Sequence, residues 1–112
     1  MKRPELALSI KQPFAEAILI GKKKVEFRST RTKRLNERVY IYASQRPREA
    51  AQFRRYRVQA DVPRGVLVGT MEISHCTWDG SRWHWHLKNP QRLGRVLRTK
   101  RRAQPVWFRP FG

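Results

Sequence analysis

The spacing of apolar positions changes twice within residues 6–28, which predicts a strand, a helix and a second strand in close succession. Residues 6–10 (LALSI) alternate weakly and predict a short strand. Pro13 has no N–H to lose in a first helical turn, and the apolar residues of 14–20 follow at helical spacing. Gly21 is a typical helix stop, and residues 25–28 return to a period of two.

The middle of the chain predicts another strand and a second helix. In residues 38–43 the aliphatic side chains share one face, which predicts that they pack inside the sheet. Tyr40 and Tyr42 lie on the other face, where they would either cover a helix or present their rings at a cleft. A helix over residues 48–59 would place its apolar side chains on one side, and Arg48, Gln52 and Arg55 on the other.

A long hairpin is predicted further along the chain. Residues 65–74 alternate as a strand, and Gly69 in its middle indicates a bulge or a close approach of two backbones. Asp79-Gly80-Ser81 is typical of a hairpin turn. In the following strand the tryptophans of residues 83–87 share one face and the two histidines the other, so we expect the tryptophans in the core.

The C-terminal quarter contains a long basic segment. Residues 88–104 contain seven Lys or Arg and no acidic residue, and their few apolar side chains predict a mobile or lightly anchored loop. Residues 104–110 then predict a short edge strand, whose prolines limit pairing with other chains.

The net charge of the chain indicates which class of partner it binds. With 26 basic and 8 acidic residues among 112, the formal net charge is +18. Such self-repulsion destabilises a compact chain unless a polyanion offsets it, so nucleic acid is the expected partner and an anionic membrane surface the lesser alternative. The single cysteine excludes an internal disulfide, and no apolar stretch is long enough for a membrane span. We expect one domain and a monomer in the cytoplasm.

The turn after the first helix gathers polar side chains. Strand alternation puts Glu26 and Arg28 on one face, and the compact turn brings Lys22 and Lys23 towards the end of the first strand. Cations bind phosphates, whereas polar side chains read base edges or 2′-hydroxyl groups. The predicted nucleic-acid-binding residues are Lys11, Gln12, Lys22, Lys23, Lys24, Glu26, Arg28, Arg31, Arg46, Arg55, Arg98, Lys100, Arg101 and Arg102.

These segments also carry a resemblance to a known family. The runs SIKQPFA at 9–15 and GKKKVEFR at 21–28, with RVYIYAS at 38–44, GVLVGTMEI at 65–73 and the closing PVWF, resemble the ASCH family. That family is related to the PUA domain of RNA-modifying proteins. The resemblance implies an α+β fold: a small, mostly antiparallel PUA-like β-barrel of five or six strands with two flanking helices. It also implies an RNA-related role, at a cleft beside the first helix.

The same resemblance suggests an enzyme as the alternative. One ASCH-like subgroup hydrolyses the acetyl amide of modified cytidine with a lysine, a threonine and a glutamate. Its lysine would match Lys23, but its threonine would fall at Glu26, and its glutamate has only Asp79 near the corresponding place. Lys23 with a depressed pKa and Glu26 are therefore candidate catalytic residues, next to the simpler interpretation that Glu26 pairs with Lys23 or Arg28.

Histidines offer two further chemical alternatives. His75, His84 and His86 are the imidazoles available for a ribonuclease that acts through the 2′-hydroxyl, although their spacing does not direct them to the turn. Together with Cys76 they invite a zinc site, but structural zinc ligands usually follow C-x₂₋₄-C or H-x₃₋₅-H spacing. We therefore expect no metal and no cofactor, and RNA binding as the function.

Overall fold

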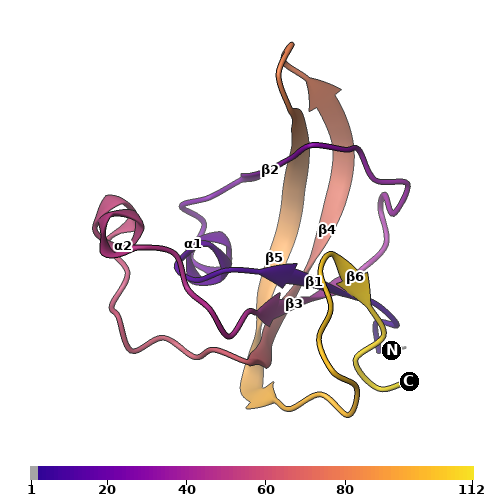
Figure 1. Cartoon of the computed structure of the whole chain (residues 1–112). Coiled ribbons are helices and arrows are strands. Elements are labelled where there is room, and N and C mark those ends of the chain that lie inside the picture. The colour runs from indigo at the N-terminus through magenta and orange to yellow at the C-terminus, as the bar shows by residue number, and fades with distance from the viewer. Residues whose placement is uncertain (1–2) are drawn as a thin grey trace.

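The computed structural model describes residues 3–112 and contains six strands and two short helices (Figure 1). In chain order the elements are β1 (Ala7–Ile10), α1 (Phe14–Leu19), β2 (Val25–Arg28), β3 (Val39–Ala43), α2 (Ala50–Tyr56), β4 (Val66–Trp78), β5 (Trp83–Leu97) and β6 (Trp107–Phe108). No helix within residues 3–112 has the length and apolar character needed to cross a membrane.

All six strands belong to one sheet, in the order β2-β5-β4-β3-β1-β6. Every neighbouring pair is antiparallel except β1 and β3, which run parallel. The sheet curls into a half-barrel, with both helices on one side of it and the chain ends on the other (Figure 1). The predicted α+β class, with two helices outside a mostly antiparallel sheet, is confirmed.

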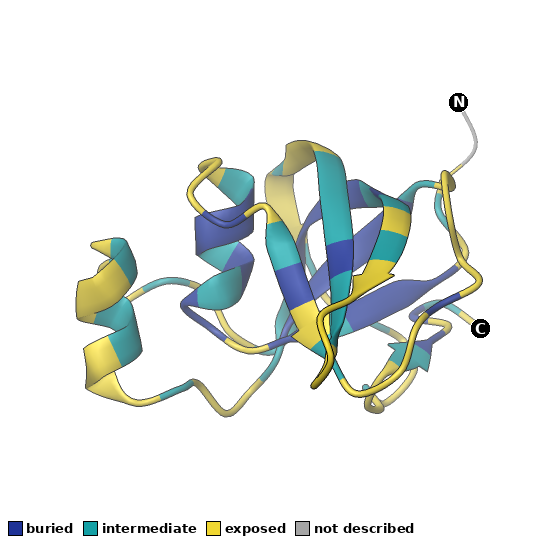
Figure 2. Cartoon of the chain, turned by 90° about the horizontal axis from the view of Figure 1, so that it is seen from above, coloured by how far each residue is buried: buried dark blue, intermediate teal, exposed yellow. Residues whose placement is uncertain are grey.

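The main core lies between the concave face of the sheet and α1, where Figure 2 shows the buried residues. Strand alternation explains much of its composition, because Val39 and Ile41 of β3 and Met71 and Ile73 of β4 point to this face. Trp85 is its largest member and is 2% exposed, with its indole N–H donating to the Thr30 carbonyl at 2.8 Å. The predicted placement of the β5 tryptophans is confirmed for Trp85, while Trp83 packs at the edge of this core.

A second, smaller core occupies the other face of β3. Tyr40 and Tyr42 are buried there, with ring centroids 6.0 Å from Phe111 and 5.2 Å from Phe108. The sequence predicted that the tyrosines would cover a helix or face a cleft. They hold the C-terminal segment against the sheet, because β6 pairs with β1 and brings Phe108 next to β3. Neither ring lines the cleft beside α1, whereas Tyr42 lines a separate pocket together with residues of the segment after β5.

The long β4–β5 hairpin curls because its pairing is interrupted. The register shifts at three places along it, and one of these is at Gly69, as predicted. A Cβ on Gly69 would lie 2.5 Å from Leu19 Cδ2 and 2.6 Å from the Gln91 carbonyl oxygen, so the residue also permits the close approach of α1. At the tip the Asp79 carboxylate accepts hydrogen bonds from the backbone N–H groups of Ser81 and Arg82.

The predicted loop over 88–104 is wrong for its first ten residues. β5 continues to Leu97, because β4 pairs with it up to Arg92 and again at Leu97. Asn89-Pro90 does not end the strand: Asn89 has a φ of 52°, and the two residues fall in a bulge between the pairs Glu72–Lys88 and Thr70–Gln91. Only residues after Leu97 form the basic loop.

The second helix is shorter than predicted. α2 covers Ala50–Tyr56 instead of 48–59, since Arg57 adopts the left-handed conformation (φ 55°) and ends it. None of its residues is buried, and it lies outside the half-barrel, in contact with α1 through the edge-to-face pair of Phe14 and Tyr56. α1 ends as predicted, with Gly21 in a conformation of positive φ.

Candidate functional site

A cleft of about 630 Å³ lies between α1, the turn after it, β2 and α2. Its walls come from five separate parts of the chain, so it exists only in the folded protein. The lining residues are Ser9, Lys11, Phe14, Lys23, Glu26, Phe27, Arg28, Ser44, Arg48, Gln52, Arg55, Tyr56, Arg82 and Pro105.

The turn after α1 positions the charged floor of the cleft. The backbone N–H groups of Lys22 and Lys23 both donate to the Ala17 carbonyl, at 2.9 and 3.0 Å, which closes the helix and reverses the chain. β2 then pairs with β5, and its alternation buries Glu26 and leaves Phe27 38% exposed. The strand therefore turns a carboxylate inward, opposite to the usual arrangement of a half-buried strand.

Glu26 lies between two cations. Its carboxylate is 3.6 Å from Lys23 Nζ, accepts a hydrogen bond from Arg28 Nε at 2.9 Å and forms an ion pair with Arg28 Nη2 at 2.8 Å. Arg28 also donates to the Ser9 carbonyl at 3.0 Å, which fixes β2 to β1. Burial lowers the pKa of Lys23, an effect opposed by the nearby Glu26. The three charged groups form a rigid, mostly buried cluster with a net charge of +1.

Aromatic rings alternate with cations along the walls. Lys23 Nζ lies 4.8 Å from the Phe14 ring centroid and 5.1 Å from that of Phe27. The guanidinium of Arg82 covers Phe27 at 3.8 Å, and that of Arg55 lies 5.5 Å from the Tyr56 ring. Such alternation provides flat surfaces for bases and positive charge for phosphates in the same space.

The structure brings five of the predicted site residues together in this cleft: Lys11, Lys23, Glu26, Arg28 and Arg55. Gln12 is fully buried beneath it, where its amide donates to the Pro63 carbonyl and its Oε1 accepts from the Glu16 N–H, both at 2.9 Å. Lys22 Nζ donates to the Tyr56 carbonyl at 2.7 Å and so ties the turn to α2. Both side chains support the cleft instead of lining it.

The remaining predicted residues lie elsewhere. Four of them line a second pocket of about 580 Å³: Arg98, Lys100, Arg101 and Arg102. Lys24, Arg31 and Arg46 are exposed and line neither hollow, although the Arg31 guanidinium lies 6.0 Å from the Trp83 ring.

Several lining residues were absent from the predicted set. Arg48 and Gln52 lie on the same side of the predicted second helix as Arg55, so the helical periodicity contained a signal for them. From the sequence pattern, Phe14 and Phe27 were indistinguishable from ordinary core residues. Arg82 is in the hairpin turn, and only the pairing of β2 with β5 brings it to the cleft.

The histidines form a separate group on the hairpin. The rings of His75 and His86 stack with centroids 4.2 Å apart, and His84 Nε2 lies 2.6 Å from the Asp79 carboxylate. Burial lowers the pKa of His86, and the neighbouring histidines add to the effect. None of the three lines either hollow, and within residues 3–112 no cluster of three His, Cys, Asp or Glu side chains could hold a metal ion.

Comparisons with known proteins identify this architecture. The solved structures that resemble the chain include the ASCH protein from Zymomonas mobilis, with 17% identity, a TM-score of 0.64 and coverage of 96% of this chain and 88% of that one. A mutant form of the same protein has 18% identity, a TM-score of 0.61 and coverage of 96% of this chain and 90% of that one. At this identity they show a shared fold. Among curated proteins, none matches significantly. The family profile of the ASCH domain, a PUA-like family that generally binds RNA, matches residues 8–103. The chain therefore belongs to the ASCH domain family.

Proposed function

We propose that this chain binds single-stranded RNA and that one nucleotide enters the cleft beside α1. The observation that carries the proposal is the alternation of three aromatic rings with basic side chains around one hollow. Its volume of about 630 Å³ is within the ordinary range of pockets that hold small organic ligands. A base would lie against an aromatic or guanidinium plane, with its phosphates near the free cations of the rim.

Lys11 and Arg55 are those free cations. Both are exposed, both line the cleft, and within residues 3–112 neither forms an ion pair, whereas Arg28 is held by Glu26. A phosphate could reach them without first displacing a carboxylate. The net charge of +18 adds a long-range attraction for a polyanion.

Gln52 supports a polar ligand rather than an apolar one. Its Oε1 is buried and has no hydrogen-bond partner within residues 3–112, although the side chain lines the cleft. Buried acceptors are nearly always satisfied in folded proteins. An amino or hydroxyl group of a bound nucleotide would supply the missing donor.

The test measures the affinity of a labelled RNA oligonucleotide by fluorescence anisotropy, for the wild type and for Phe27→Ala. Loss of one stacking surface is expected to weaken binding by about 5- to 150-fold, since stacking on an aromatic ring contributes about 1–3 kcal/mol per base. Leu35→Ala is the matched control, because Leu35 is 39% exposed against 38% for Phe27 and lines neither hollow. Equal losses in both variants, or none in Phe27→Ala, would remove the cleft from RNA binding.

A second candidate function rests on Lys23. Its side chain is only 5% exposed, burial lowers its pKa, and Glu26 is next to it. A neutral Lys23 amine could take a proton from water as the oxygen attacks an acyl carbon, and return it to the nitrogen that leaves when the C–N bond breaks. This chemistry would make the chain an amidohydrolase of an acylated nucleoside. As a general base, Lys23 could equally deprotonate a 2′-hydroxyl in a ribonuclease.

Turnover distinguishes the two functions. Wild type, Lys23→Arg and Glu26→Gln are incubated with short RNA and with acylated cytidine, and products are followed by chromatography. If the cleft only binds, no protein yields product, and Glu26→Gln leaves RNA affinity unchanged or higher because a negative charge is lost. If the cleft is catalytic, Lys23→Arg abolishes turnover, since arginine cannot act as a base at neutral pH, and it does not weaken RNA affinity, since its guanidinium is positively charged.

A further inference from the structure

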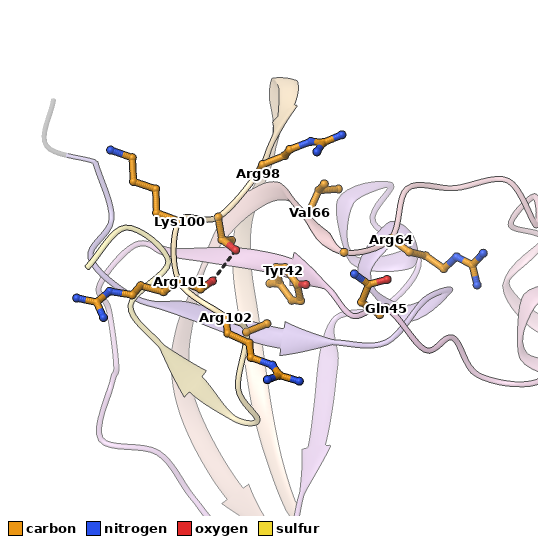
Figure 3. Close-up of a pocket in the computed structure, with 11 residues that line it drawn as sticks. Tyr42, Gln45, Arg64, Val66, Arg98, Lys100, Arg101 and Arg102 are labelled. Carbon is orange, nitrogen blue, oxygen red and sulfur yellow. Dashed lines mark hydrogen bonds between the residues drawn. The ribbon is translucent and has the colours of Figure 1, made fainter.

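The pocket of about 580 Å³ lies where β3 and β4 meet the loop after β5. Figure 3 shows Tyr42 and Gln45 at its centre, with basic side chains around them whose charged ends point outward. Tyr42 is 5% exposed, and burial raises the pKa of its hydroxyl. The base of the pocket is therefore a neutral donor and an amide, while its rim is positively charged.

The rim carries charge without compensation. Its five basic residues are exposed, and within residues 3–112 none of them forms an ion pair: Arg64, Arg98, Lys100, Arg101 and Arg102. Among the residues that the structure describes, no acidic one lines this pocket. The carboxylates of the chain that form ion pairs all do so with other cations. Five unpaired cations around one hollow are the electrostatic footprint of a polyanion site.

The backbone beneath these side chains is anchored. The N–H groups of Lys100 and Arg101 both donate to the Pro110 carbonyl, at 2.8 and 3.0 Å, and Thr99 Oγ1 donates to the Arg101 carbonyl at 2.7 Å (Figure 3). The loop after Leu97 is thus tied to the C-terminal segment. Its flexible side chains start from fixed positions, so less order is lost when they bind.

The pocket and the cleft are neighbours. At the end of β3, Ser44 lines the cleft and Gln45 lines the pocket. In the C-terminal segment Ala103 lines the pocket and Pro105 lines the cleft, while the Gln104 carbonyl between them accepts a hydrogen bond from Ser9 Oγ at 2.9 Å. One strap of three residues therefore separates the two hollows.

We propose that the Tyr42 pocket is a second anion-binding site, which takes the phosphodiester backbone of the strand whose nucleotide occupies the cleft. This assignment rests on the function proposed above. Cations that point outward along a rim suit successive phosphates of an extended strand, whereas a single buried phosphate needs converging donors. A flat anionic membrane would meet the rim but would not reach Tyr42 in the hollow. Contacts to phosphates alone carry no sequence information, so this site supplies affinity and direction.

The test compares a triple variant of the rim, Arg98→Gln/Lys100→Gln/Arg102→Gln, with a control triple, Lys33→Gln/Arg54→Gln/Arg95→Gln. The control residues are exposed, line neither hollow and lose the same charge. Affinities for a dinucleotide and for RNA of ten nucleotides, in several sequences, are measured between 50 and 200 mM salt. For the longer RNA the rim triple should flatten the slope of log affinity against log salt by about 2, at about 0.7 per lost phosphate contact.

The rim triple should also weaken the longer RNA by about tenfold or more at 50 mM salt, equally for every sequence, and leave the dinucleotide within about twofold. Equal losses in the two triples would overturn the second site, as would a loss confined to one RNA sequence. The rim triple could instead abolish binding to phosphatidylserine vesicles and leave RNA affinity intact. That outcome would assign the pocket to a membrane and would also overturn the proposed second RNA site. The proposed role of the cleft is tested separately: if Phe27→Ala does not change the affinity for the dinucleotide, the cleft does not bind RNA.

Discussion

The cleft and the Tyr42 pocket are similar in volume and both rich in cations, yet they hold charge in opposite ways. In the cleft, Lys23 and Arg28 are fixed by Glu26 and by aromatic rings, and most of their surface is buried. In the pocket every cation is exposed and unpaired within residues 3–112. A fixed charge has a defined geometry, and burial lowers the pKa of Lys23, whereas a free charge contributes mainly long-range attraction.

This difference separates recognition from affinity. Groups held in one geometry discriminate between ligands, because a wrong ligand leaves them unpaired. Mobile surface cations accept any phosphate, and salt weakens them by screening and by counterion effects. The following experiments test whether the two hollows divide the work in this way.

The largest contrast is expected in stability. Within residues 3–112 Glu26 is the only carboxylate that pairs with Lys23 and Arg28. Because an unpaired buried cation is costly, Glu26→Gln should lower the free energy of unfolding by about 3 kcal/mol. Arg102→Gln, in the exposed rim, should change it by less than about 0.5 kcal/mol. Urea denaturation followed by tryptophan fluorescence measures both. A stable Glu26→Gln protein would mean that the cleft charges are as free as those of the rim.

Salt should separate the ligands of the two hollows. RNA of ten nucleotides, contacting about four phosphates, should lose affinity roughly 50-fold between 50 and 200 mM salt at about 0.7 log units per contact. A mononucleotide, confined to the cleft with one contact, should lose about threefold. Isothermal titration calorimetry at matched pH gives both slopes. If the affinities of the two ligands depended equally on salt, the cleft, too, would bind mainly through non-specific electrostatic attraction.

Lys23 should give a pH dependence that an exposed lysine does not share. Burial lowers its pKa from the ordinary 10.5, so between the lowered value and 10.5 the unfolded chain binds the proton that the folded chain has released. The free energy of unfolding of the wild type should therefore rise with pH in this window relative to Lys23→Met. Lys100→Met is the control with the same change in charge. An identical pH profile for wild type and Lys23→Met would show that Lys23 is not desolvated.

The smallest effect concerns Gln52, where stability and binding should move in opposite directions. Gln52→Met keeps the length of the side chain and removes the buried Oε1, which has no hydrogen-bond partner within residues 3–112. The free energy of unfolding should therefore stay the same or rise by up to about 1 kcal/mol. RNA affinity should fall by about five- to tenfold, because one hydrogen bond to the ligand is lost. Gln59→Met is the exposed control. Unchanged affinity would leave the acceptor without a role in the cleft.

Local patterns determined most of the elements. The strand before Pro13, the first helix with its stop at Gly21, the alternating β3 and the turn at Asp79 follow from side-chain period and turn chemistry alone. The same patterns brought Lys11, Lys23, Glu26 and Arg28 to one place, because they lie on adjacent elements joined by a short turn. The charge balance, and with it the expectation of a polyanion partner, also needs only the sequence.

Other features depend on contacts between residues far apart in the sequence, and only the tertiary structure reveals them. The sequence predicted a basic loop over residues 88–97, yet they form a strand because β4 pairs with Lys88, Gln91, Arg92 and Leu97. A bulge accommodates Asn89-Pro90. Gln12 reads as a ligand-binding side chain, but the fold buries it beneath the cleft. Arg82 and the Tyr42 pocket depend on residues distant in sequence, and no local period reports which strands pair. The reason is physical: propensity acts over a few residues, whereas a cleft is defined by the packing of elements far apart in the chain.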